Sequence, residues 1–183
     1  MNQYFLLRKS LAEGGLDFLF KTPFDEDVES LIYYGKVDED DYISWRPVEK
    51  KEIYDFSSLE EKLGIRMHVS VIEYFNSYWF ADLDGFITDH YIKLESVQQT
   101  TDIESYFKLI VGYKHNHDNK LEHIPIGIEG NGLIVVVDNQ NGLVKLEDFE
   151  RKSFEVISEG IEQLIVTLRL QKEINIQIII VRS

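Results

Sequence analysis

Two Asn-Gly pairs, Asn131-Gly132 and Asn141-Gly142, constrain the fold of this chain more than any other feature. They separate three apolar stretches, at 123–128, 132–139 and 142–148 (HIPIGI, GLIVVVDN and GLVKLED). Asn-Gly tolerates the positive backbone angles that tight hairpin turns need. The sequence therefore predicts a three-stranded antiparallel meander in this region.

Hydrophobic periodicity indicates the elements around this meander. Apolar residues at spacings of three and four predict helices at residues 3–20, 57–64, 68–78, 100–116 and 153–170. Ser57 with Glu60 and Thr101 with Glu104 have the spacing of capping boxes. Alternating residues predict strands at 42–48 and 85–97, and the last apolar stretch, 174–183, is interpreted as a strand or an exposed tail.

Strands and helices that are interspersed around an antiparallel run are typical of the α+β class. We expect a single domain with a mixed, largely antiparallel sheet that contains the hairpin meander and is covered by helices. Residues 1–24 are assigned to an N-terminal helical extension, and residues 25–183 to the α+β domain. A chain of 183 residues buries enough surface for a core without a metal or a disulfide.

Acidic residues are concentrated in one part of the chain. The net charge is −14, and residues 21–90 contain 7 basic and 17 acidic side chains, a net of −10. The acids cluster at 25–29, 38–41 and 60–61. Such a field repels nucleic acids and anionic lipid headgroups and attracts basic proteins. We therefore expect a basic protein surface as the partner, with no nucleic-acid binding and no direct insertion into lipid. The alternative is that the acids only keep the protein in solution.

The compartment is predicted from what the sequence lacks. There are no cysteines, which fits a reducing environment. No apolar run approaches the roughly 18–20 residues that span a bilayer. The first residues, MNQYFLLRKSLAEGG, lack the pattern of a secretory signal. The expected location is the cytoplasm.

The stretch WFADLDGFITD (79–89) is the strongest candidate for a catalytic motif. Asp82 and Asp84 match the opening motif of dehalogenase-type phosphatases, in which the first aspartate attacks phosphorus and the second is the general acid and base. That motif should end a buried parallel strand, whereas here it follows the helical spacing of residues 68–78. Asp138, a candidate for the later acidic motif, has no acidic companion nearby. The phosphatase stays a distant alternative, and we expect no enzymatic activity.

Metal binding has one candidate cluster. His115, His117 and Asp118, with His123 beyond them, offer donor atoms for a transition metal. They end a predicted helix among Asn and Lys residues, where exposed, unliganded histidines are the usual case. A calcium loop built on the Asp-Leu-Asp-Gly segment lacks its first and last carboxylates. We expect no metal and no cofactor.

Five stretches, taken in order, carry a resemblance to a known family: YISWRPV (42–48), SLEEKLGIRMHVSVIEYFNSYWFADLDGF (58–86), TTDIESYFKLIVGYKHNH (100–117), IVVVDNQNGLVKLEDF (134–149) and KSFEVISEGIEQLI (152–165). Together they resemble the Syd family of SecY-interacting proteins, a branch of the SUKH superfamily, from about Val28 to Leu168. Three features depart from the family pattern. Val69 stands where proline is usual, Val111-Gly112-Tyr113 replaces Ile-Gly-His, and the last residues extend past the usual end.

The resemblance implies a protein without catalytic activity that docks on basic cytoplasmic loops of the SecY translocon. Such a protein would associate peripherally with the cytoplasmic face of the cell membrane. The same superfamily also includes immunity proteins, so the alternative is a protein that neutralises a basic toxin such as a nuclease. An acidic surface suits both kinds of partner.

The expected partner-binding residues are acidic side chains with two aromatic anchors: Asp82, Asp84, Glu73, Asp38, Glu39, Asp40, Asp41, Trp45 and Trp79. Tryptophan is enriched at interaction hot spots. The alternatives are that Asp82 and Asp84 hydrogen-bond within a turn and that both tryptophans belong to the core. The last strand-like segment is a candidate for pairing across a homodimer.

Overall fold

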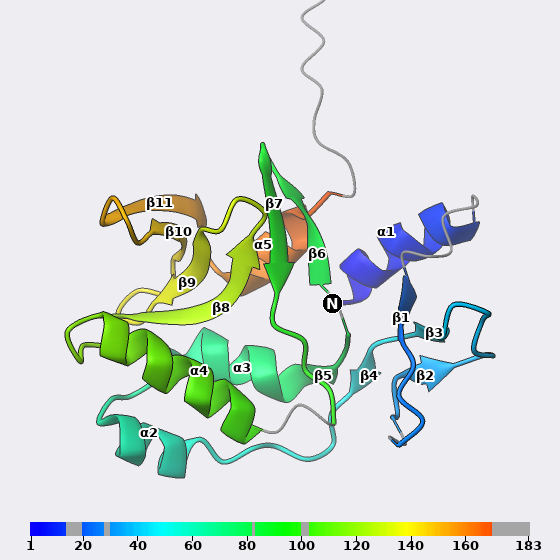
Figure 1. Ribbon diagram of the computed structural model, residues 1–183, viewed down its shortest axis with the longest axis horizontal. Helices are drawn as coiled ribbons and strands as arrows, with labels where there is room; N and C mark the ends of the chain where they lie inside the picture. The colour runs from blue at the N-terminus through cyan, green and yellow to red at the C-terminus, as the bar shows by residue number, and fades with distance from the viewer. Residues whose placement is uncertain (14–19, 28–29, 82, 100–102, 170–183) are drawn as a thin grey trace, which may run out of the picture.

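The fold is built on one curled sheet of six strands, shown in Figure 1. The computed structural model describes residues 1–13, 20–27, 30–81, 83–99 and 103–169. Neighbouring strands are antiparallel and follow one another in chain order: β6 (Leu83–Ile87), β7 (His90–Leu94), β8 (His123–Glu129), β9 (Ile134–Asp138), β10 (Val144–Asp148) and β11 (Ser153–Ser158). The predicted α+β domain with a largely antiparallel sheet is confirmed.

The meander predicted from the two Asn-Gly pairs is present as β8, β9 and β10. Gly132 and Gly142 have φ angles of 94° and 77°, in the left-handed region that glycine enters without strain. At Gly142 a side chain would also collide, since a Cβ atom there would lie 2.4 Å from the His68 ring. The glycines therefore allow both turns, and the second turn packs against His68.

Helices cover the sheet and hold its two edges together. In Figure 1, α2 (Ser57–Leu63), α3 (Val69–Ser77) and α4 (Ile103–Asn116) lie along the lower side of the sheet, with α4 against β8. α5 (Ile161–Thr167) contacts β6 and β11, the two edge strands, so the sheet curls around this helix. Within the part of the chain that the structure describes, no helix has the length and apolar character needed to cross a lipid bilayer.

A smaller antiparallel sheet stands beside the first, at the right of Figure 1, in the order β1 (Lys21–Pro23), β3 (Tyr42–Trp45) and β2 (Tyr33–Tyr34). Pro47 follows β3, so the strand predicted at 42–48 is divided into β3 and the short β4 (Val48–Glu49). β4 pairs with β5 (Tyr78–Trp79), which connects the small sheet to the end of α3. α1 (Asn2–Glu13) packs against α5.

One hydrophobic core extends through both sheets and the helices. Its buried members include Tyr4 of α1, Trp45 of β3, Phe75 of α3, Ile110 of α4 and Leu146 of β10. The N-terminal helix thus shares its buried tyrosine, 3% exposed, with the rest of the molecule. The division of the chain into residues 1–24 and 25–183 stays a prediction.

The helix predicted at residues 153–170 is wrong in its first part. Ser153–Ser158 forms β11, which pairs with β10, and α5 begins only after Gly160. Phe154 and Ile157 fit a helical spacing, but the same residues also fit the alternation of a strand. Pairing with the free edge of β10 outweighs the local preference, as tertiary context commonly does.

Two further local predictions are corrected. The single strand predicted at 85–97 is the β6–β7 hairpin, which turns at Thr88, a residue with φ 50°. Asp84 therefore lies in β6 and not in a turn. The capping box of Ser57 and Glu60 is also wrong, because no side chain caps α2 within the described ranges. Thr101 and the segment 170–183 lie outside the described residues.

Candidate functional site: the acidic lobe

Two acidic loops lie side by side on the small sheet. Pro23 of β1 is opposite Tyr42 of β3, and the N–H of Phe24 donates to the carbonyl of Asp41 over 2.8 Å. This contact places the loop after β1 next to the loop that leads into β3. We refer to the exposed carboxylates of the two loops as the acidic lobe: Asp25, Glu26, Asp27, Glu39, Asp40 and Asp41.

Asp38 shapes one of these loops and does not add to its free charge. One carboxylate oxygen accepts the N–H groups of Asp40 and Tyr42 at 3.1 and 2.9 Å, and the other accepts Lys21 Nζ at 2.7 Å. The hydrogen bond from Lys21, followed by those from the backbone, holds the pKa of Asp38 below its usual value. Asp38 is therefore a structural carboxylate that fixes the direction in which the acidic lobe projects.

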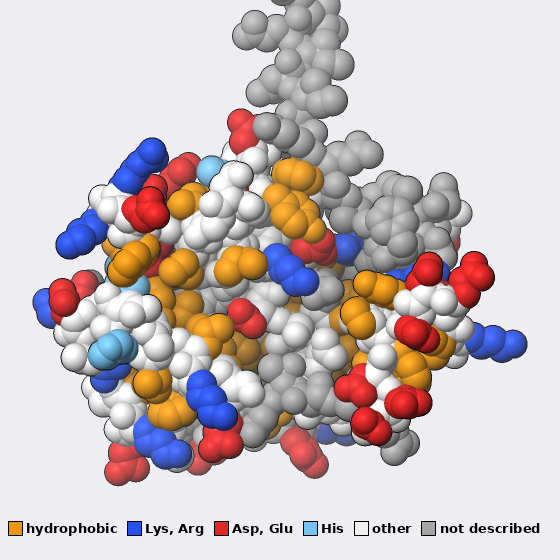
Figure 2. Space-filling model, in the orientation of Figure 1, with side chains coloured by type: hydrophobic (Ala, Val, Ile, Leu, Met, Phe, Trp, Pro, Cys, Tyr) orange, Lys and Arg blue, Asp and Glu red, His pale blue; other side chains and the backbone are white. Residues whose placement is uncertain are grey.

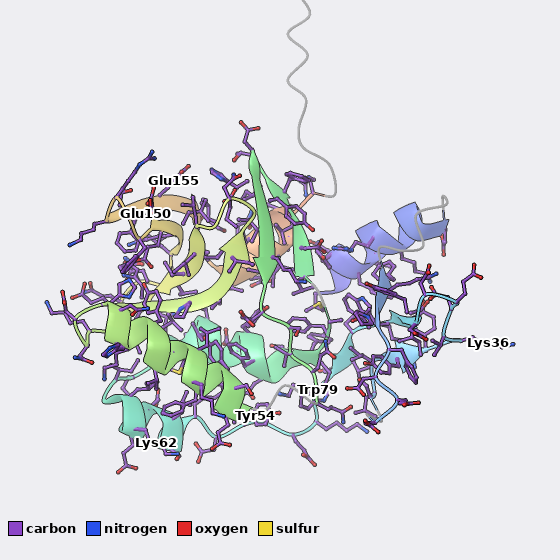
Figure 3. All side chains as sticks on the ribbon, viewed as in Figure 1. Lys36, Tyr54, Lys62, Trp79, Glu150 and Glu155 are labelled. Carbon is purple, nitrogen blue, oxygen red and sulfur yellow. The ribbon has the colours of Figure 1, made fainter. Side chains whose placement is uncertain are left out.

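The acidic lobe combines free negative charge with apolar side chains. Among the described residues, no ion pair joins its carboxylates to a cation. Leu31, Tyr34, Val37 and Tyr42 are exposed on the same small sheet and its loops. Figure 2 shows acidic and hydrophobic side chains interleaved at the right of the molecule, and Figure 3 shows Lys36 projecting from the outer edge. Such a surface fits a partner that presents both cations and apolar groups.

Asp84, which was predicted to face a partner, is instead engaged by other side chains of the same molecule. Arg8 of α1, only 4% exposed, lies 2.6 Å from one Asp84 carboxylate oxygen and donates to the Asp84 carbonyl at 2.9 Å. The Tyr4 hydroxyl accepts the Asp84 N–H at 2.8 Å, and the Tyr91 hydroxyl donates to the second carboxylate oxygen. Asp84 thus fastens α1 to β6. Asp82 lies outside the described residues.

The same geometry differs from what the phosphatase alternative requires. A dehalogenase-type site needs free aspartates at the end of a buried parallel strand. β6 is antiparallel to β7, and both carboxylate oxygens of Asp84 are engaged by Arg8 and Tyr91. Asp84 in this arrangement is placed to hold the fold together.

The two tryptophans have different environments. Trp45 is 1% exposed and packs in the core against Phe20, with ring centroids 5.8 Å apart, so it is not a surface anchor. Trp79 is half-buried and forms a cage with Tyr54 around Lys50. The Lys50 Nζ atom lies 3.9 Å from the Trp79 ring centroid and 3.8 Å from that of Tyr54. Figure 3 shows Trp79 and Tyr54 next to each other at the lower edge of the molecule.

Lys50 is the cation of this cage and was missed in the sequence. Its ammonium donates to the Phe75 carbonyl at 2.8 Å, and within the described ranges it has no carboxylate partner. Burial lowers the pKa of Lys50 to about 8. The sequence holds no signal for the cage, because the pairing of β4 with β5 is what brings Lys50 to Trp79.

Glu73, the remaining predicted site residue, is exposed on α3. It lines a cleft of about 240 Å³ together with Met1 and Ile161. In Figure 1 this helix lies below the large sheet, whereas the acidic lobe belongs to the small sheet. The structure therefore does not bring Glu73 into the acidic lobe.

Of the histidine cluster, His117 forms a contact between the end of α4 and β10. His117 Nε2 lies 2.5 Å from a Glu147 carboxylate oxygen, and Nδ1 lies 2.7 Å from the Tyr113 carbonyl. Burial opposes the charged ring, but the hydrogen bonds to these two acceptors outweigh it and raise the pKa of His117. His123 stacks on Phe154. In the described part of the chain, no three His, Asp or Glu side chains converge to hold a metal.

Comparison with known proteins assigns the chain to a family. A family model described as Syd protein (SUKH-2) matches residues 13–169, which is most of the chain. The chain belongs to the Syd family. It is similar to Protein Syd of Idiomarina loihiensis, with 29% identity over 144 residues (76% of this chain and 78% of that protein). Protein Syd of Pseudoalteromonas atlantica is 27% identical over 166 residues, 86% and 85% of the two chains.

The Syd match confirms the resemblance seen in the sequence. The matched range contains the acidic lobe, the Lys50 cage and the large sheet, whereas most of α1 precedes it. Arg8 therefore reaches from outside the matched range to Asp84 inside it. In this chain, α1 is therefore joined to the matched domain by an ion pair between a buried arginine and a partly exposed aspartate.

Proposed function

We propose that this protein is a non-catalytic binding protein of the Syd type that docks on the basic cytoplasmic loops of SecY. The acidic lobe carries the proposal, because free carboxylates and exposed apolar side chains share one surface. Cytoplasmic loops of membrane proteins have an excess of Lys and Arg. Complementary charge speeds the encounter, and burial of the apolar side chains adds to the stability of the complex.

The proposed location follows from this partner. A protein that binds the loops of SecY stays outside the bilayer, at the cytoplasmic face, and associates with the membrane only through its partner. Solvated charges are screened beyond about 8 Å at physiological ionic strength. We therefore expect the association to weaken steeply as salt is added.

The acidic lobe also fits a second candidate partner, a basic toxin domain that this protein would neutralise, which the resemblance to the SUKH superfamily implies. The acidic lobe would then cover a cationic surface of the toxin, such as the nucleic-acid site of a nuclease. The two candidate functions share the same surface and differ in what binds there.

The test is a pull-down with tagged protein from detergent-solubilised bacterial membranes, with SecY detected by antibody. The variant Glu39→Gln/Asp40→Asn/Asp41→Asn removes three charges from the acidic lobe and keeps Asp38. At about 0.5 kcal/mol for each exposed charge contact, SecY binding should weaken roughly tenfold. The native protein should retain SecY up to moderate salt.

The matched control is Glu150→Gln/Glu155→Gln/Glu159→Gln, which removes three exposed charges elsewhere. Figure 3 shows Glu150 and Glu155 on the opposite side of the molecule from Lys36. Equal losses with both triple variants would show that only net charge matters and would contradict the acidic lobe as the site. Absence of SecY from the native eluate would contradict SecY as the partner. Inhibition of a purified basic nuclease toxin would then support the alternative.

A further inference from the structure

An apolar groove runs between α4 and the strands β8 and β9. Its volume is about 350 Å³, and its walls include Leu109 and Tyr113 of α4, Ile128 of β8, Ile134 of β9 and Phe149 after β10. Ile128 and Phe149 are 57% and 50% exposed, and Leu109 is exposed as well. Figure 2 shows hydrophobic side chains gathered over this part of the molecule. The volume is at the small end of ligand clefts, which span roughly 300–1,000 Å³.

The groove exists because α4 covers only part of the sheet surface beside β8. α4 buries Tyr106, Ile110 and Tyr113, and the Tyr106 hydroxyl donates to the carbonyl of Pro125 in β8 at 3.0 Å. Leu109 lies on the flank of the helix, beside the open part of the sheet. Contiguous exposed apolar side chains of this kind mark interaction sites in proteins.

One carboxylate lies in the wall of this groove without a cation. Glu95 follows β7, and its backbone is fixed because its N–H donates to Ile126 and its carbonyl accepts the Tyr74 hydroxyl. The carboxylate itself has no hydrogen bond or ion pair with any residue that the structure describes. Burial raises the pKa of Glu95, and the charge of Lys93 only partly opposes this.

The cations near the groove are already engaged or are not in contact with Glu95. His117 lines the same groove, but its two ring nitrogens face Glu147 and the Tyr113 carbonyl. Lys93 precedes Glu95 by two residues and is exposed, with contacts of its own. The groove therefore offers apolar walls and one partly desolvated acid that gains from a cation supplied by another molecule.

We propose that this groove binds a short segment of a partner protein in which one Lys or Arg is flanked by large apolar residues. The apolar residues contact Leu109, Ile128 and Phe149, and the cation pairs with Glu95. A metal ion is not the expected occupant, because it needs several ligands and the groove offers a single carboxylate. A simple ammonium ion is not expected either, because it would leave the apolar walls without contacts. This site is separate from the acidic lobe and does not depend on SecY being the partner.

The two surfaces differ in what they would contribute to binding. The acidic lobe is solvated and acts over a distance, so it affects mainly the rate of encounter. The groove is partly desolvated and fits one cation, so it selects which segment binds. A charge-assisted hydrogen bond in such a place is stronger than one between solvated groups.

The test uses two peptide probes and NMR titration of isotope-labelled protein. The first probe is acetyl-Gly-Leu-Lys-Phe-Gly-amide, and the second has norleucine in place of lysine. We expect the lysine peptide to bind about tenfold more tightly, with shifts at Leu109 and Ile128, and to lower the pKa of Glu95 measured by carboxyl ¹³C shifts. Glu95→Gln should remove the preference and leave the norleucine affinity unchanged.

Two further variants separate this site from general effects. Leu109→Ser/Ile128→Ser, at exposed positions, should weaken both peptides, and Glu39→Gln in the acidic lobe should change neither. A lysine preference that persists in Glu95→Gln overturns the proposal, as do shifts that map outside the groove. Failure of both peptides to bind at millimolar concentration also overturns it.

Discussion

The buried ion pair between Arg8 and Asp84 predicts a large effect of one substitution. Arg8 is 4% exposed and the Asp84 side chain is 20% exposed. Removing one partner of a buried pair costs about 3–5 kcal/mol, because the other charge is left unpaired. Water reaches Asp84 and Tyr91 keeps one hydrogen bond to it, so we expect Arg8→Met to cost about 2–4 kcal/mol. For a chain of this length the melting temperature should fall by roughly 5–15 °C.

The assay is urea unfolding followed by circular dichroism, with Lys9→Met as the control. Lys9 is exposed on the same helix, 4.0 Å from Glu13, and should change the free energy of unfolding by less than about 0.5 kcal/mol. The double variant Arg8→Met/Asp84→Asn should lose less than the sum of the single losses. A cost below about 1 kcal/mol for Arg8→Met would refute the argument that this pair fastens α1 to the sheet.

Three other predictions concern stability. Burial lowers the pKa of Lys50 to about 8, so the unfolded chain binds more protons between pH 8 and roughly 10.4. The native protein should therefore gain stability relative to Lys50→Met as pH rises through this range, measured by urea unfolding. The raised pKa of His117 has the opposite effect on stability. The stabilisation by the charged ring is complete below about pH 6.5 and is lost as pH rises through the pKa of His117 in the folded protein. His117→Phe should thus cost more at pH 5.5 than at pH 9 in the same assay. Gly142→Ala, which combines φ 77° with a 2.4 Å contact to His68, should lower the free energy of unfolding by about 2–3 kcal/mol, against about 1 kcal/mol for Gly132→Ala.

Each of these has a clear contrary result. Equal pH profiles for the native protein and Lys50→Met would show that the ammonium is not desolvated by the aromatic cage. A pH-independent cost of His117→Phe would show that the ring acts by packing and not by charge. Equal costs at Gly142 and Gly132 would remove the collision with His68 from the explanation.

The sequence predicted those features that depend on local chemistry. The Asn-Gly turns of the meander depend on neighbouring residues only. The same holds for the end of α2 at Gly64, where φ is 70°. β11 was missed because its residues fit two periodicities, and only the neighbouring β10 decides between them. For the same reason, sequence patterns identify turns more securely than the elements that pack between them.

The sequence indicated the position of some residues of the candidate site, and their role in partner binding stays a prediction. Asp38 to Asp41 lie at the surface of the small sheet. Asp84, in contrast, forms an ion pair with Arg8, which stands 76 residues earlier in the chain. Trp45 is in the core, and Trp79 has Lys50 as a partner. No sequence pattern reports contacts between residues so far apart, and the groove beside Glu95 likewise depends on how far α4 covers the sheet.

The strand order of the large sheet also bears on how the chain folds. Each strand of this sheet pairs with the strand that precedes it in the chain, and only β7 and β8 are separated by a helix. Most pairings therefore close short loops. α1 is the exception, because the ion pair of Arg8 can form only after Asp84 has been placed in β6. We expect Arg8→Met to speed unfolding much more than it slows folding, which stopped-flow measurements in urea would show. Of the described elements, α1 would then be the last to dock, although it comes first in their order along the chain.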